Sequence, residues 1–107
     1  MERSLKSVRI VLDEEKILRE GKYKLEDLYV YLDEIAKEAK LHKQDKFTYY
    51  ADKNENDMAR LGIFTINRAI DNEAITRNVK EWYWLKDGVI TTDVIQSAKR
   101  EGHGVWE

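Results

Sequence analysis

The chain has 107 residues, with 19 basic and 21 acidic side chains, a net charge of −2 and no cysteine. Its length and its hydrophobic fraction of 42% are those of one globular domain with a single core. The near-balance of charge argues against a general polyanion-binding protein, and the lack of cysteine excludes disulfides, thiolate metal sites and a cysteine nucleophile.

The first half of the chain predicts a strand, a short helix and a long helix. Residues 7–12 are a β-branched run with two apolar faces, which is typical of a strand near the centre of a sheet. Asp13 suits the N-cap of a short helix over 14–19, and Gly21 can end that helix. Residues 24–40 predict a long amphipathic helix. Its apolar stripe consists of Leu25, Leu28, Tyr29, Leu32, Ile35, Ala36 and Ala39.

The middle of the chain is harder to interpret. Residues 47–51 predict a strand, and a polar loop follows it. Residues 61–66 also have the composition of a strand. However, Asn56 is available as a helix N-cap, and the apolar residues after it share one helical face. These residues are Ala59, Ile63, Ile66 and Ile70. We favour the strand over 61–66 and keep the helix as the alternative.

A Trp-Tyr-Trp run within residues 80–85 is the most informative part of the chain. Aromatic residues fit a pleated surface, so the run predicts a strand that ends at Asp87-Gly88. Because side chains alternate along a strand, Trp82 and Trp84 share one face, and Tyr83 and Leu85 share the other. The strand is therefore either covered on both faces or offers one face to a partner.

Two structures compete for the segment after this turn. We favour a short helix near 92–101, because a threonine or aspartate precedes it, basic residues end it and Gly102 follows. The alternative is a hairpin in which residues 89–94 pair back through a type I′ turn. We expect one domain over 1–107, with 102–107 as a flexible tail unless Trp106 docks.

These elements predict an α+β fold. We expect a small mixed or antiparallel sheet of three or four strands, with the long helix on one face and a short C-terminal helix beside it. A split β-α-β, ferredoxin-like order is compatible with the predicted elements. The N-terminus has no apolar signal region, and no apolar stretch of roughly 18 residues occurs. We therefore expect a soluble cytoplasmic protein that does not enter the membrane.

Four short phrases resemble a known group of proteins. They are LDEEK at 12–16, EGKY at 20–23, MARLGIF at 58–64 and VKEWYW at 79–84. In this order they resemble small uncharacterised proteins carried on conjugative transposons and related mobile elements of Gram-positive bacteria. The resemblance spans most of the chain and thins after Gly88. It implies a cytoplasmic accessory protein and no assigned activity, so it carries over no functional residues.

No catalytic, cofactor or metal motif is present in the sequence. Asp52-x-Asn54-x-Asn56 begins like a calcium-binding EF-hand loop, but that loop needs a glycine where Asp57 stands and a bidentate glutamate where Ile63 stands. The two histidines, at 42 and 103, belong to no spaced ligand set. The serines and glycines form neither a nucleophile elbow nor a phosphate-binding loop. We therefore expect no enzymatic activity, no metal and no cofactor.

The remaining hypothesis is binding. Tryptophan and tyrosine are enriched at the centres of protein interfaces, so we expect contact with a protein partner or self-association. The alternative is nucleic-acid binding, with bases stacked on the aromatic face and phosphates held by arginines. After its role in the core is considered, only the Trp82 and Trp84 face of the strand remains a candidate contact face. The candidate surface as a whole is Trp82, Trp84, Arg60, Arg68, Val30 and Tyr31.

Overall fold

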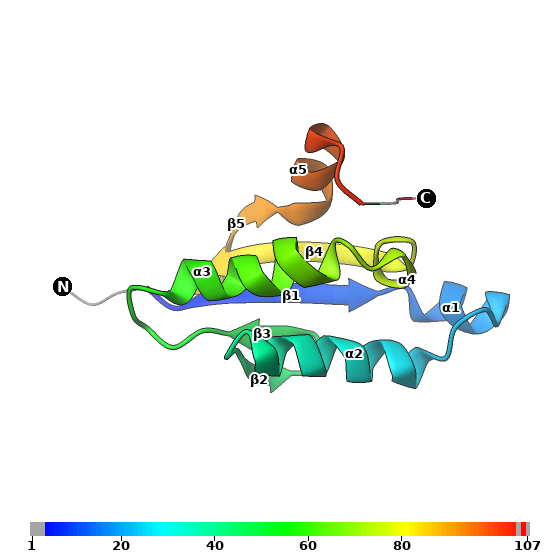
Figure 1. The fold of residues 1–107 in the computed structure, drawn as a ribbon, viewed down its shortest axis with the longest axis horizontal. Coiled ribbons are helices and arrows are strands. Elements are labelled where there is room, and N and C mark those ends of the chain that lie inside the picture. Colours follow the sequence, from blue (N-terminus) through cyan, green and yellow to red (C-terminus); the bar gives the residue numbers. More distant parts are fainter. Residues whose placement is uncertain (1–3, 105, 107) are drawn as a thin grey trace.

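A five-stranded antiparallel sheet forms the centre of the computed structural model, which describes residues 4–104 and 106 (Figure 1). The strand order is β2-β3-β1-β4-β5, and every neighbouring pair is antiparallel. The strands are β1 (Lys6–Leu12), β2 (His42–Asp45), β3 (Thr48–Tyr50), β4 (Val79–Lys86) and β5 (Val89–Asp93). The predicted α+β class is confirmed, and the sheet has five strands where three or four were expected.

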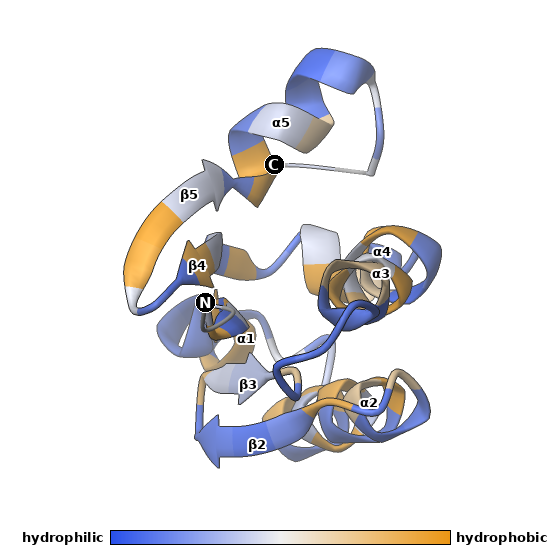
Figure 2. Cartoon of the chain, turned by 90° about the vertical axis from the view of Figure 1, so that its left-hand side faces the viewer, coloured by the Kyte–Doolittle hydropathy of each residue, from blue (hydrophilic) through white to orange (hydrophobic). Residues whose placement is uncertain are grey.

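The helices are α1 (Glu14–Glu20), α2 (Leu25–Glu38), α3 (Asp57–Gly62), the π-helix η1 (Ile63–Ala69), α4 (Glu73–Thr76) and α5 (Val94–Glu101). Figure 2 shows α2 and α3 on the same side of the sheet. Asp13 caps α1 by accepting a hydrogen bond from the Lys16 N–H, and Gly21 ends it with a φ of 64°. The predicted bounds of α1 and of the long helix α2 are therefore confirmed to within a few residues.

The first four strands follow the split β-α-β order. In chain order, α2 connects β1 to β2, and α3–η1 connects β3 to β4, which gives β-α-β-β-α-β. The spatial order β2-β3-β1-β4 with antiparallel neighbours is the ferredoxin-like arrangement. Strand β5 and helix α5 extend this arrangement beyond β4.

Residues 61–66 are helical, so the predicted strand is wrong and the helical alternative is correct. The buried side is nevertheless not the expected one. Ile63 and Ile66 are 40% and 54% exposed, whereas Phe64 and Thr65 are buried. In the π-helix the Ile70 N–H donates to the Thr65 carbonyl, five residues back. A π-turn holds more residues than an α-turn, so the side chains here do not follow α-helical spacing.

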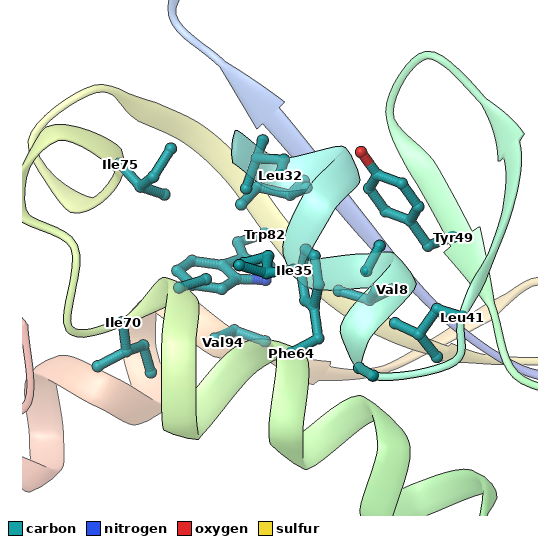
Figure 3. Close-up of a cluster of buried hydrophobic side chains, with 14 of the residues drawn as sticks. Val8, Leu32, Ile35, Leu41, Tyr49, Phe64, Ile70, Ile75, Trp82 and Val94 are labelled. Carbon is teal, nitrogen blue, oxygen red and sulfur yellow. The ribbon is translucent and has the colours of Figure 1, made fainter. Parts of the chain in front are cut away.

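Trp82 lies at the centre of the core (Figure 3). Its side chain has no exposed surface, and the figure shows it among Ile35 of α2, Phe64 of η1 and Val94 of α5. The indole N–H of Trp82 has no hydrogen-bond acceptor within the described residues. Trp84, on the same face and half-buried, donates its indole N–H to Thr65 Oγ1 at 2.9 Å.

Both structures that competed for the segment after β4 are present. Asp87 and Gly88 both have positive φ, 50° and 80°, as a type I′ turn requires, and β5 pairs back onto β4. Helix α5 then begins at Val94, where Asp93 accepts a hydrogen bond from the Gln96 N–H.

The tail after α5 turns back toward the sheet. Gly102 ends α5 with a φ of 74°. The indole of Trp106 is half-buried, donates to the His103 carbonyl at 2.6 Å and lies 6.5 Å from the Trp82 ring. Residues 105 and 107 of the predicted flexible tail lie outside the described residues.

Two tyrosines, Tyr29 of α2 and Tyr49 of β3, make the stability of the fold sensitive to alkaline pH. Tyr29 donates its hydroxyl to Glu14, and Tyr49 donates to Asp33. Burial, and then these carboxylates, raise the pKa of both phenols above the ordinary 10.0. A pKa raised by folding stabilises the protein below the ordinary value, and this contribution is lost as pH rises above it.

We therefore expect the free energy of unfolding, measured in urea, to fall as pH rises above about 10. The double variant Tyr29→Phe/Tyr49→Phe should show a smaller fall over the same range. An equal fall in the wild type and the variant would contradict this assignment.

Candidate interaction surface

The residues predicted as a contact surface do not form one continuous surface. Trp82 is fully buried beneath the helices and Trp84 half-buried, so the Trp face of β4 belongs to the core. Val30 is exposed on α2, and Tyr31 donates its hydroxyl to the Arg68 carbonyl on η1 at 3.3 Å. The structure thus brings together Tyr31 and Arg68 in the helical layer and separates them from the aromatic strand.

The two predicted arginines have carboxylate neighbours. Arg68 lies 3.0 Å from Glu38, and Arg60 lies 3.9 Å from Asp52. An ion-paired arginine has less charge to offer a phosphate, and both arginines lie on the helical layer. Bases cannot stack on Trp82, because its ring has no exposed surface. The predicted combination of exposed tryptophans and neighbouring arginines is therefore not assembled in this structure.

The opposite face of the sheet is open. Helices α2 and α3–η1 lie on one side, α1 lies beyond the end of β1, and among the described residues no helix crosses the other side (Figures 1 and 2). We call this surface the open face. Along β1, β3 and β4 its members alternate with the core residues, and the register with these strands assigns its members on β2 and β5. They are Ser7, Arg9, Val11, His42, Asp45, Thr48, Tyr50, Glu81, Tyr83, Leu85, Ile90 and Asp93.

The register arranges the open face in rows across the strands. In the first row, Ser7 of β1 pairs with Tyr50 on one side and Leu85 on the other. His42 and Ile90 extend this row to the two edges. In the second row, Arg9 lies between Thr48 and Tyr83, and Asp45 and Asp93 extend it to the edges.

Small residues at the centre of the open face are surrounded by larger apolar ones. Ser7, which lies between Tyr50 and Leu85, retains only 6% exposure, and Thr48 retains 7%. Tyr50, Tyr83 and Leu85 are half-buried. Each of these three is therefore partly accessible to a partner.

The charges on the open face are mostly negative. Asp45, Glu81 and Asp93 are its carboxylates, and Arg9 contributes a positive charge. The Phe47 backbone N–H, which donates to Asp45 at 3.0 Å, lowers the pKa of that carboxyl, and Arg9 adds to the effect. Asp45 is therefore ionised at neutral pH. An acidic rim of this kind repels phosphates and attracts basic side chains.

His42 lies at the β2 end of the open face. Its Nε2 lies 3.0 Å from Asp52 Oδ1, and its ring centroid lies 5.2 Å from that of Tyr50. The His42 ring therefore extends the aromatic surface of Tyr50 to the edge of the sheet.

The two edges of the sheet are less suited to strand addition. Strand β2 is fully exposed and carries the sequence HKQD, and charged side chains on an edge discourage pairing with another chain. Strand β5 exposes Val89 and Ile90, but its register with β4 shifts between Trp84 and Leu85. Such a bulge twists an edge strand away from a regular ladder. The face of the sheet is therefore a better contact surface than either edge.

Comparisons with known proteins find no matching family model, no similar curated protein and no similar solved structure. No helix in the described residues is both long and apolar enough to cross a membrane. Within the same residues, no three His, Cys, Asp or Glu side chains lie together in a group that could hold a metal ion.

Sequence reasoning identified the correct strand and favoured the other face. The alternation in β4 places Tyr83 and Leu85 opposite the tryptophans, as predicted. The alternation alone does not indicate which face the helices cover. The size of the side chains does, because helices pack best over the face with the largest apolar area.

Proposed function

We propose that this protein is a binding module that contacts another protein through the open face. The observation that carries the proposal is the half-buried cluster of Tyr50, Tyr83 and Leu85 on a face that no described helix crosses. Aromatic residues are enriched at the centres of protein interfaces, and a sheet presents them on a rigid base. The accessory role that the mobile-element resemblance implies is compatible with such a module.

The charge on the open face supports a basic partner. Three carboxylates, those of Asp45, Glu81 and Asp93, lie on one side of the row that holds Tyr50 and Leu85, and Arg9 is the cation among them. Two copies of this face would bring like charges together, which disfavours a dimer formed through it. We propose a partner segment with an apolar centre and lysines or arginines around it. The same carboxylates would repel the phosphates of a nucleic acid, which argues against nucleic-acid binding through this face.

Selection of peptides from a random phage-displayed library on the folded protein tests this proposal. Selected peptides should combine aromatic or aliphatic residues with a net positive charge. The double variant Tyr50→Ala/Leu85→Ala should weaken their binding by about ten-fold or more, as hot-spot residues do. Higher salt should slow their association. Isothermal titration calorimetry and stopped-flow fluorescence with synthetic peptides measure these effects.

Val30→Ala is the matched control, because Val30 is exposed on the helical side of the molecule. It should leave peptide binding unchanged. The proposal fails if the selected peptides bind the Tyr50→Ala/Leu85→Ala variant as tightly as the wild type. It also fails if the peptides are acidic, or if Val30→Ala is the variant that weakens their binding.

A further inference from the structure

A concave site lies at the end of the sheet where β4 has a strand neighbour on one side only. Strand β5 pairs with β4 from Tyr83 onward, so the part of β4 before Tyr83 has β1 beside it but not β5. Helix α5 and Trp106 lie on that free side, and α4 and α1 close the ends. The resulting cleft has a volume of about 580 Å³, which is within the range of small-molecule sites.

The cleft is basic, although the whole protein is slightly acidic. Its cations are Lys16, Arg77, Lys80 and Lys99, and its carboxylates are Asp13 and Asp93. Each carboxylate caps a helix: Asp13 accepts from the Lys16 N–H and Asp93 from the Gln96 N–H. The acids of the cleft are therefore engaged with backbone groups of their own helices.

Two of the four cations are engaged with protein groups, and two have no carboxylate partner. Lys16 donates to the Arg77 carbonyl at 2.5 Å, and Arg77 is ion-paired with Glu73 at 2.5 Å. Lys80 and Lys99 are exposed, and within the described residues neither lies within ion-pair distance of a carboxylate. Lys80 extends from β4 and Lys99 from α5, so two separate elements present ammonium groups to the same cleft.

The aromatic lining of the cleft is Tyr83 and Trp106. Lys99 Nζ lies 6.0 Å from the centroid of the Trp106 ring. A cation held over an indole is only weakly engaged and can turn to an anion at low cost. Tyr83 adds a hydroxyl, which can donate a hydrogen bond to a phosphate oxygen.

We propose that this cleft binds a phosphate group of a small phosphorylated molecule, held chiefly by Lys80 and Lys99. Lysine is a common ligand of phosphate and acts on it as a point charge. The volume accommodates a compound of mononucleotide size. The cleft shares Tyr83 and Asp93 with the open face, but Lys80 and Lys99 are not among the open-face residues. The substitutions that test one proposal therefore leave the residues substituted for the other intact.

Titration of the full chain with inorganic phosphate, pyrophosphate and a nucleoside triphosphate, each at low salt, tests the proposal. Two-dimensional ¹H–¹⁵N NMR is suitable because the chain has three tryptophans and thus three indole N–H signals. The Trp106 indole signal should shift, while that of the fully buried Trp82 should move less. Affinity should rise from phosphate to pyrophosphate and fall with added salt.

Lys80→Gln and Lys99→Gln should each weaken pyrophosphate binding by about ten-fold, the usual loss for one charge-assisted contact. Lys37→Gln, an exposed lysine on α2, should have no effect. Gly104→Ala should also weaken binding, since a Cβ at Gly104 would lie 2.9 Å from the Trp106 indole and displace it. Lys80 and Lys99 are exposed, so we expect each variant to keep its fold. The NMR spectrum of each variant without ligand checks this.

Three outcomes would overturn the proposal. The first is no shift at 10 mM pyrophosphate, a concentration of the order that detects even weak binding. The second is binding that neither lysine substitution weakens. The third is a single-stranded oligonucleotide that binds far more tightly than the triphosphate, which would make the cleft part of a nucleic-acid surface.

Discussion

Replacing Trp82 with alanine is expected to lower the free energy of unfolding by about 3–5 kcal/mol. The side chain is fully buried, and its neighbours come from α2, η1 and α5, so its loss leaves a cavity that several elements would have to move to fill. Such a loss is a large fraction of the stability of a domain of this size. Urea unfolding followed by far-ultraviolet circular dichroism measures it.

Tyr83→Ala is the matched control, since Tyr83 is the next residue of β4 and lies on the open face. It is half-buried, and we expect its replacement to cost about 1 kcal/mol. Equal losses for the two variants would show that the helices do not cover the Trp face. Trp82→Phe should be milder than Trp82→Ala, because phenylalanine leaves a much smaller cavity. Neither variant loses a hydrogen bond of the indole N–H, which has no acceptor within the described residues.

Replacing Lys6 with methionine should lower the free energy of unfolding by about 1–3 kcal/mol. Lys6 Nζ lies 3.4 Å from Asp57 Oδ2, and the Asp57 side chain is only 1% exposed. This pair joins β1 to the start of α3, across 51 residues of sequence. A buried carboxylate that loses a cation keeps its desolvation penalty, and methionine conserves the volume of lysine without its charge.

Arg68→Met is the control for this second prediction. Arg68 and Glu38 are 3.0 Å apart, closer than Lys6 and Asp57, but their side chains are 47% and 57% exposed. An exposed ion pair contributes about 0–1 kcal/mol, so this variant should be nearly as stable as the wild type. If the two variants lose equal stability in urea, burial is not what makes the Lys6–Asp57 pair important.

Local patterns predicted much of the fold. The apolar stripe of α2, the Asp13 cap and the Asp87-Gly88 turn each involve residues close in sequence, and each appears as expected. Strand β2 was missed because HKQD has no apolar residue and therefore no alternation to detect. It is a strand because it pairs with β3, which depends on the hairpin and not on its own side chains.

The parts that could not be predicted depend on long-range packing. In residues 61–66 the sequence supports both a strand and a helix, and the choice follows from η1 packing beside α2 over the sheet. The same packing decides that Trp82 is covered while Tyr83 is not. The cleft is another case, because Lys80, Lys99 and Trp106 meet only after α5 folds back along β4. No spacing in the sequence indicates that meeting.

The extension of the sheet by β5 and α5 has a consequence for the dynamics of the fold. Helix α5 packs on β4 and β5, while the β-α-β-β-α-β unit has its own connections through β1. A segment attached along one strand can open as a cooperative unit at a lower free energy than global unfolding. Opening of residues 89–104 together with Trp106 would remove one wall of the cleft and expose the edge of Trp82, while β1 and β3 remain paired. Occupation of the cleft would then slow hydrogen exchange in α5 without changing it in β1.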